Sequence, residues 1–153
     1  MQKLLQQPWL LVNDLFHQLG MILKETSDRT EDLLDSFPVP FCDNIRIFNV
    51  KLIKSEDYRG YIASKKRYFY GVRVQLLTTK SGIPVEFVFL PGSAYDVRAL
   101  NSLPLNLPPG SEIYADSAYT DYTSEDDLID SSQIEIKGMR KKNSKRQDKP
   151  WIQ

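Results

Sequence analysis

The stretch YGVRVQLLTTKSGIPVEFVFL, residues 70–90, decides the fold class. Along residues 70–78, apolar side chains alternate with polar ones such as Gln75, which predicts a strand with one buried face. Residues 80–82, Lys-Ser-Gly, are typical of a turn, and the apolar residues 85–90 then return as the second strand. The sequence therefore predicts an antiparallel hairpin.

Shorter apolar segments on both sides of this hairpin complete an α/β pattern. An amphipathic helix is predicted over residues 9–24 with Pro8 in its first turn, and short strands over 33–37, 112–115 and 134–136. Pro38 and Pro40 are expected to end the first strand. Helices are predicted over residues 95–103, capped by Ser93, and 124–129, capped by Ser124. This order predicts a mixed sheet flanked by helices, which an RNase H-like layout matches, as do other α/β folds.

Composition indicates one globular domain whose charges are unevenly distributed. The chain has 153 residues, of which 41% are hydrophobic and 26% charged, with a net charge of zero. Residues 99–136 contain eight acids and no Lys or Arg, whereas residues 137–149 contain seven basic residues and the single acid Asp148. The basic segment predicts contact with a polyanion, and a disordered tail is the alternative.

Cysteine and apolar content exclude several classes of protein. The one cysteine, Cys42, excludes an internal disulfide and a multi-cysteine zinc site. The longest apolar run near the start, residues 9–12, is too short for a membrane span or a signal segment. We therefore expect a cytoplasmic protein without membrane contact.

Two aspartates follow apolar strand segments, where a carboxylate is costly unless it is bonded. Asp35 lies in the segment Leu33-Leu34-Asp35-Ser36-Phe37, and Asp116 follows the predicted strand 112–115. Carboxylates on adjacent strands can bind divalent cations for phosphodiester chemistry. The alternative is that both are turn-forming residues at strand ends. The sequence contains no glycine-rich phosphate loop, paired-histidine zinc helix or serine nucleophile elbow. Its one histidine, His17, is predicted to lie on the surface of a helix.

Two basic segments are candidates for DNA contact. Lys65, Lys66 and Arg67 precede the aromatic residues 68–70, and the alternative for them is a solvated strand end beside core aromatics. The second group is Arg140, Lys141, Lys142, Lys145 and Arg146. Cations in such a row are suited to following a phosphate backbone.

Five motifs resemble those of bacterial insertion-sequence transposases of the DDE type. In chain order they are DSFPVPFC at 35–42, RGYIASK at 59–65 with YFYG at 68–71, the segment 82–96 with PGS at 91–93, YADSAY at 114–119 and RKKNSK at 140–145. The resemblance extends from Leu15 to the end of the chain. It implies an RNase H-like fold in which Asp35 and Asp116 are the first two catalytic and metal-binding residues of a carboxylate triad. The implied cofactor is Mg²⁺ or Mn²⁺. The implied reaction cuts DNA at element ends and joins the freed 3′-OH to a target strand.

The sequence departs from the family pattern at three places. The family's third acid, a glutamate on a later helix, has no counterpart, because Glu135 comes too early and Asp148 lies in the charged tail. Ser117 stands where the family often has a lysine, and Gln75 where it usually has a histidine.

These departures predict an incomplete catalytic domain. We expect an N-terminal helix and acidic linker at 1–32, a partial RNase H-like domain at 33–137 that lacks its last catalytic helix, and a basic tail at 138–153. Apolar sheet surface should then be exposed, with marginal stability or self-association. The expected function is a transposase domain that is inactive alone. The alternatives are a non-catalytic DNA-binding fragment that modulates or dimerises with an intact transposase, and a relic without function.

Overall fold

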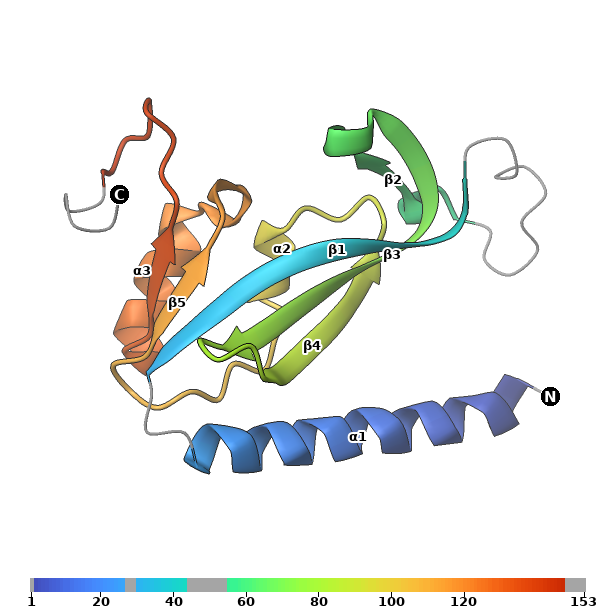
Figure 1. The fold of residues 1–153 in the computed structure, drawn as a ribbon, viewed down its shortest axis with the longest axis horizontal. Helices are drawn as coiled ribbons and strands as arrows, with labels where there is room; N and C mark the ends of the chain where they lie inside the picture. Colours follow the sequence, from blue (N-terminus) through green and yellow to red (C-terminus); the bar gives the residue numbers. More distant parts are fainter. Residues whose placement is uncertain (1, 27–29, 44–54, 148–153) are drawn as a thin grey trace.

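A computed structural model describes residues 2–26, 30–43 and 55–147. Its centre is a mixed six-stranded sheet with strand order β2-β3-β1-β5-β6, and β4 also pairs with β3 (Figure 1). The strands are β1 (Glu31–Asp43), β2 (Arg59–Ile62), β3 (Arg67–Thr79), β4 (Pro84–Pro91), β5 (Glu112–Ala115) and β6 (Glu135–Gly138). The helices are α1 (Gln2–Thr26), α2 (Val97–Leu100) and α3 (Tyr122–Ser132). The predicted mixed sheet flanked by helices is confirmed.

The predicted hairpin is formed by β3 and β4. The two strands pair antiparallel, with Val74 opposite Phe89 and Leu76 opposite Phe87. The turn between them has Gly82 at a φ of 82°, a left-handed conformation that favours glycine. The hairpin was predictable because both its strands and its turn carry local sequence signals.

Strand β1 is longer than predicted and continues through two prolines. It runs over thirteen residues, with Pro38 opposite Arg73 and Pro40 opposite Gly71 of β3. Strand β5 pairs with β1 only as far as Leu34, so among the described residues β3 alone pairs with the later part of β1. Proline is tolerated there because an edge position does not require its missing N–H. The prediction that Pro38 ends the strand is therefore wrong.

Helix α1 lies along β4 (Figure 1). Phe16 packs edge-on against Phe87 with ring centroids 4.6 Å apart. Gly20 lies so close to β4 that a Cβ atom would be 1.9 Å from the Val85 carbonyl oxygen. The helix begins at Gln2, so Pro8 lies inside it and the prediction of a start near Trp9 is wrong. Within the described residues, no helix combines the length and apolarity needed to cross a bilayer.

Three further predictions are corrected by the structure. His17 is not a plain surface residue, since its Nδ1 bonds Glu86 Oε2 at 2.8 Å. Helix α3 begins after Asp121, and Ser124 lies within its first turn, where its Oγ donates to Asp121 Oδ2 at 2.6 Å. Helix α2 is shorter than the predicted 95–103, and strand β2 was not predicted at all.

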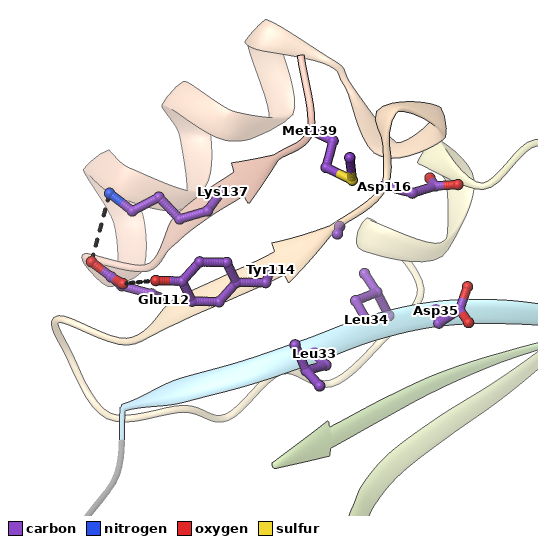
Figure 2. A pocket seen from close by; sticks show the side chains of 9 residues that line it. Leu33, Leu34, Asp35, Glu112, Tyr114, Asp116, Lys137 and Met139 are labelled. Carbon is purple, nitrogen blue, oxygen red and sulfur yellow. Dashed lines mark hydrogen bonds and ion pairs between the residues drawn. The ribbon is translucent and has the colours of Figure 1, made fainter. Parts of the chain in front are cut away.

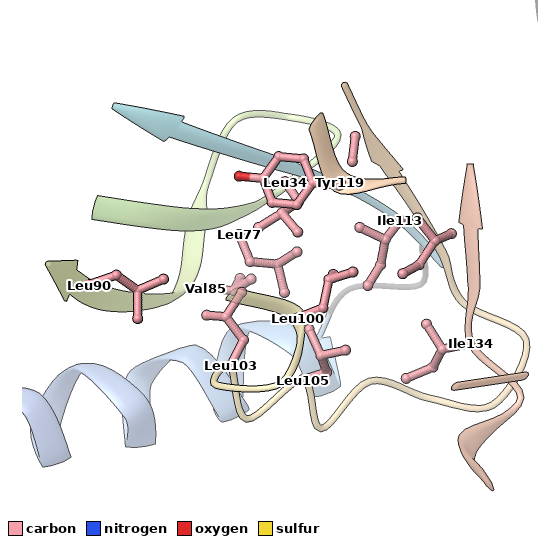
Figure 3. Close-up of a cluster of buried hydrophobic side chains, with 12 residues drawn as sticks. Leu34, Leu77, Val85, Leu90, Leu100, Leu103, Leu105, Ile113, Tyr119 and Ile134 are labelled. Atoms are coloured by element: carbon pink, nitrogen blue, oxygen red, sulfur yellow. The ribbon is translucent and has the colours of Figure 1, made fainter. Parts of the chain in front are cut away.

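The hydrophobic core lies on one face of the sheet (Figure 3). Leu34, Leu77, Ile113 and Ile136 come from four strands, and the chain after β4 covers them with leucines at 100, 103 and 105. Because side chains alternate along a strand, the other face of β1 carries Leu33, Phe37 and Val39, which are 37–46% exposed. We call these three residues the open face of β1. The expected exposed apolar sheet surface is therefore present.

Candidate functional site

Asp35 and Asp116 directly follow the last paired residues of two parallel strands. Strands β1 and β5 pair from Glu31 opposite Glu112 to Leu34 opposite Ala115. Asp35 is the residue after Leu34, and Asp116 is the residue after Ala115. Both line a pocket of about 670 Å³ (Figure 2). The prediction of a strand end is confirmed for Asp116, which follows β5, but it is wrong for Asp35, which lies inside β1. Both acids follow the last residues that pair β1 with β5.

Each aspartate also accepts a local backbone hydrogen bond. The Ser36 N–H donates to Asp35 Oδ1 at 2.7 Å. Asp116 caps the short 3₁₀ helix η4 (Ser117–Tyr119), because its Oδ1 accepts from the Ala118 N–H at 2.8 Å. Asp116 therefore does form a turn, as the alternative interpretation expected. Both side chains are exposed, so neither carboxylate is a costly buried charge, and they form a candidate site because they line the same pocket.

The donor set fits a hard divalent cation. Carboxylate oxygens are the ligands that Mg²⁺ prefers, and Mg²⁺ is often held by one or two carboxylates while water and substrate phosphate complete its shell. Asp35 and Asp116 supply two such groups in the lining of one pocket. In the part of the chain that the structure describes, no cluster of three or more His, Cys, Asp or Glu side chains is placed to hold a metal ion.

The other end of the pocket contains a charged group that the sequence did not indicate. The Tyr114 hydroxyl donates to Glu112 Oε2 at 2.8 Å, and this bond raises the pKa of Tyr114 to about 12. Lys137 Nζ lies 2.6 Å from Glu135 Oε1 and 3.6 Å from Glu112 Oε1. Burial favours the neutral amine, but the two glutamates outweigh it and raise the pKa of Lys137. Lys137 is therefore a fixed cation in the pocket wall.

A buried polar group lies close to both aspartates. Gln75, predicted on the polar face of a half-buried strand, is fully buried. Its side chain bonds Asp96 and the Tyr119 hydroxyl. Burial, followed by the nearby Asp96, raises the pKa of Tyr119, and Asp35 and Asp116 act in the same direction. Sequence reasoning missed this group because an alternating pattern does not show whether a polar face meets solvent.

The basic residues predicted to contact DNA differ in their surroundings. Arg140 makes a buried two-pronged ion pair with Glu125 at 2.7 and 2.6 Å. Arg146 makes an exposed one with Asp126 at 2.7 and 2.8 Å. Both guanidinium groups lie over the Tyr122 ring, 5.5 and 4.7 Å from its centroid. These pairs anchor the segment after β6 to α3.

The lysines of both basic segments are exposed to solvent. Lys141, Lys142 and Lys145 follow β6 at one edge of the sheet. Lys65 and Lys66 lie in the turn between β2 and β3, where Lys66 is left-handed with a φ of 48°, and Arg67 is half-buried. Because β2 and β6 end the strand order, the two basic segments belong to opposite edges of the sheet.

Comparison with known proteins identifies the family. Residues 27–151 match the family described as Transposase DDE domain. Since this match covers most of the chain, the protein belongs to that family. The resemblance inferred from the five motifs is confirmed.

A solved structure shows the same fold in a larger protein. The chain is similar to the piggyBac transposase in a synaptic complex with hairpin DNA, with a TM-score of 0.53 and 15% sequence identity. The match covers 90% of this chain and 30% of that one. The sheet and helices therefore match part of an RNase H-like transposase fold. A search of curated proteins found no significant match.

Proposed function

We propose that this domain contributes to DNA transposition by metal-dependent phosphodiester cleavage and strand transfer. The observation that carries the proposal is that Asp35 and Asp116 directly follow the last paired residues of β1 and β5 and line one pocket. Membership of the Transposase DDE domain family supports it. Transposition acts on chromosomal DNA, so the place of action would be the bacterial nucleoid in the cytoplasm.

Asp35 and Asp116 would hold Mg²⁺ or Mn²⁺. A bound divalent cation activates the attacking oxygen and stabilises the leaving oxygen in phosphodiester chemistry. The protein's part is to fix both carboxylates. The Ser36 N–H holds Asp35 Oδ1, and the Ala118 N–H holds Asp116 Oδ1. Each bond restricts the side chain and leaves its second oxygen to be aimed at the ion.

The site formed by the described residues contains two carboxylates, whereas the family's triad has three. The absence of a larger acidic cluster in those residues supports the proposal that the site is completed by a further acidic ligand. We therefore expect the 153-residue chain by itself to show little strand transfer. A dimer with an intact transposase is one arrangement that would supply the missing ligand.

The DNA would lie along the exposed lysines. Lys141, Lys142 and Lys145 are available to phosphates beside β6, and Lys65, Lys66 and Arg67 form the corresponding group beside β2. Arg140 and Arg146 would contact DNA only by exchanging Glu125 and Asp126 for phosphate. We expect Lys141 to contribute more to binding than Arg140, which is held in a buried pair.

A strand-transfer assay tests the catalytic proposal. The substrate is duplex DNA taken from the two flanks of the protein's own coding region, with Mg²⁺ or Mn²⁺ and a plasmid target. The full chain is compared with Asp35→Ala, Asp116→Ala and the control Asp127→Ala on the exposed side of α3. Joining by the parent chain is expected to be weak and metal-dependent, and its loss in both site variants supports the site. Joining that persists in Asp35→Ala at the level of the parent would exclude it.

Non-catalytic DNA binding is the second candidate function, favoured by the exposed lysines at 141, 142 and 145. Binding to duplex DNA should weaken steeply with salt, and removing two phosphate contacts should lower the slope of log K against log[salt] by about 2. The variant is Lys141→Ala with Lys142→Ala, measured by fluorescence anisotropy from about 50 to about 200 mM salt. A parent chain that does not bind DNA at the lowest salt would rule this function out.

A further inference from the structure

A continuous chain of side-chain hydrogen bonds connects the two segments that carry the aspartates. Ser36 Oγ donates to Asp96 Oδ1 at 2.8 Å, and Gln75 Nε2 donates to the same oxygen at 2.9 Å. At its other end the Gln75 amide accepts, since the Tyr119 hydroxyl donates to Gln75 Oε1. These hydrogen bonds thus connect β1 to Asp96, the residue before α2, then Asp96 to β3, and finally β3 to η4.

Both ends of this hydrogen-bond chain adjoin the backbone groups that hold the carboxylates. Ser36 is the residue whose N–H donates to Asp35 Oδ1 at 2.7 Å. Tyr119 is the last residue of η4, and the preceding residue, Ala118, donates its N–H to Asp116 Oδ1 at 2.8 Å. A shift of either end would therefore move an aspartate directly.

Burial makes the chain of bonds rigid. Gln75 is 0% exposed and Tyr119 is 1% exposed. A buried polar group that loses its partner costs far more than an exposed one, so these groups have a strong preference for one arrangement. Gln75 is suited to the central place because one amide carries both a donor and an acceptor.

We propose that Gln75, together with Asp96 and Tyr119, is a positioning group that fixes the separation of Asp35 and Asp116 for divalent-metal binding. This inference rests on the proposed function in one respect: the two aspartates bind the ion. Gln75 acts through the hydrogen bonds and does not touch the metal. The competing explanation is that the bonds only stabilise the core.

Metal affinity separates these explanations when it is measured beside stability. The probe is Mn²⁺ alone, with free Mn²⁺ followed by electron paramagnetic resonance, on the full 153-residue chain. Urea unfolding without metal gives the stability of each variant. The variants are Tyr119→Phe, Gln75→Leu and their combination. The matched control is Tyr70→Phe, because Tyr70 is also buried on β3 and its hydroxyl bonds the Ser55 backbone at 2.7 and 2.8 Å.

The positioning role predicts a specific pattern. Tyr119→Phe and Gln75→Leu should each weaken Mn²⁺ binding about tenfold, as loss of outer-shell partners commonly does. The double variant should bind Mn²⁺ no more weakly than Gln75→Leu, because both substitutions interrupt the same series of hydrogen bonds. Tyr70→Phe should lower stability and leave Mn²⁺ affinity unchanged. Gln75→His retains a donor and an acceptor and should restore most of the affinity.

Two results would overturn the inference, and they differ from failure of the metal site. The first is loss of Mn²⁺ binding in Asp35→Asn and Asp116→Asn while Tyr119→Phe and Gln75→Leu bind like the parent, in which case the site stands without the positioning group. The second is a loss of affinity that follows stability equally in Tyr119→Phe and Tyr70→Phe, which indicates a purely structural role. If the two asparagine variants bind Mn²⁺ normally, the proposed metal site fails and the inference fails with it. Should Gln75→Leu not fold, Tyr119→Phe decides, since it retains the ring.

Discussion

Replacing Asp32 by Asn should stabilise the domain at neutral pH and leave its stability unchanged in acid. Asp32 lies on the core face of β1, between Thr79 and Ile113 of the neighbouring strands, and is 5% exposed. Burial raises the pKa of Asp32 from 3.8 to about 6, although the attraction of Lys24 acts in the opposite direction. The folded state thus disfavours the carboxylate relative to the unfolded chain.

The folded-state pKa of Asp32, about 6, lies well above its ordinary value of 3.8. Each unit corresponds to about 1.36 kcal/mol, so the ionised Asp32 costs at most about 3 kcal/mol of folding free energy. Because folding raises the pKa of Asp32, the domain has its full stability below pH 3.8, where Asp32 is protonated. It loses up to this amount of folding free energy as the pH rises through about 6. The asparagine side chain of the variant carries no charge, so its advantage should grow over the same pH range. Lys24 retains the Leu105 carbonyl oxygen at 3.1 Å.

Urea unfolding at about pH 4 and about pH 7.5 tests this expectation. Asp32→Asn should match the parent at the lower pH and exceed it by roughly 2–3 kcal/mol at the higher one. The control Asp130→Asn lies on the exposed side of α3 and should track the parent at both. An Asp32→Asn chain that is no more stable than the parent at the higher pH would refute the reasoning.

Three other predictions concern a buried ion pair, the packing of α1 and self-association. Glu125→Ala removes the two hydrogen bonds that Glu125 makes with the buried Arg140, and it should lower the free energy of unfolding by about 3 kcal/mol or more. Asp126→Asn, at the exposed pair with Arg146, should leave the urea midpoint unchanged, and equal effects of the two variants would contradict the difference in burial. Gly20→Ala should displace α1 from β4, because its Cβ would lie 1.9 Å from the Val85 carbonyl oxygen. The amides of α1 should therefore exchange faster in Gly20→Ala than in the control Gln18→Ala, and equal exchange in the two variants would argue against the close approach. Phe37→Lys with Val39→Lys should reduce self-association in sedimentation velocity at unchanged stability, since both residues lie on the open face of β1. Tyr95→Lys, at a residue that is 84% exposed elsewhere, should not reduce it, and an oligomer that persists in the double variant would place the contact on another surface.

Local sequence signals were sufficient for the hairpin and for the strand end that precedes Asp116. The predicted strand at 112–115 agrees with β5 at both ends, because Ile113 and Ala115 alternate with half-exposed neighbours and Asp116 terminates them. Asp35 was expected at a strand end as well, but β1 continues beyond it to Asp43. The register that sets Leu34 opposite Ala115 comes from tertiary packing, on which no local pattern bears.

The wrong predictions for Pro38 and Gln75 also arise from tertiary contacts that a local pattern does not show. Pro38 is a strand breaker in isolation, yet it is accepted in β1 because that part of the strand pairs on one side among the described residues. The alternating pattern predicts that Gln75 faces solvent, yet Gln75 is buried because Asp96 and Tyr119 satisfy its hydrogen bonds. In each case the deciding partner lies far away in the sequence.

The parallel pairing of β1 with β5 also has a consequence for how the domain folds. The two aspartates are separated in sequence by the whole β3–β4 hairpin and α2. Such non-local contacts close a long loop and form slowly compared with helices and hairpins. A partly folded chain can therefore contain the complete hairpin and still lack the proposed metal site. The kinetics with which refolding chains acquire Mn²⁺ affinity would then report the last long-range step, and a newly synthesised chain would be unable to bind the ion until most of its sheet had assembled.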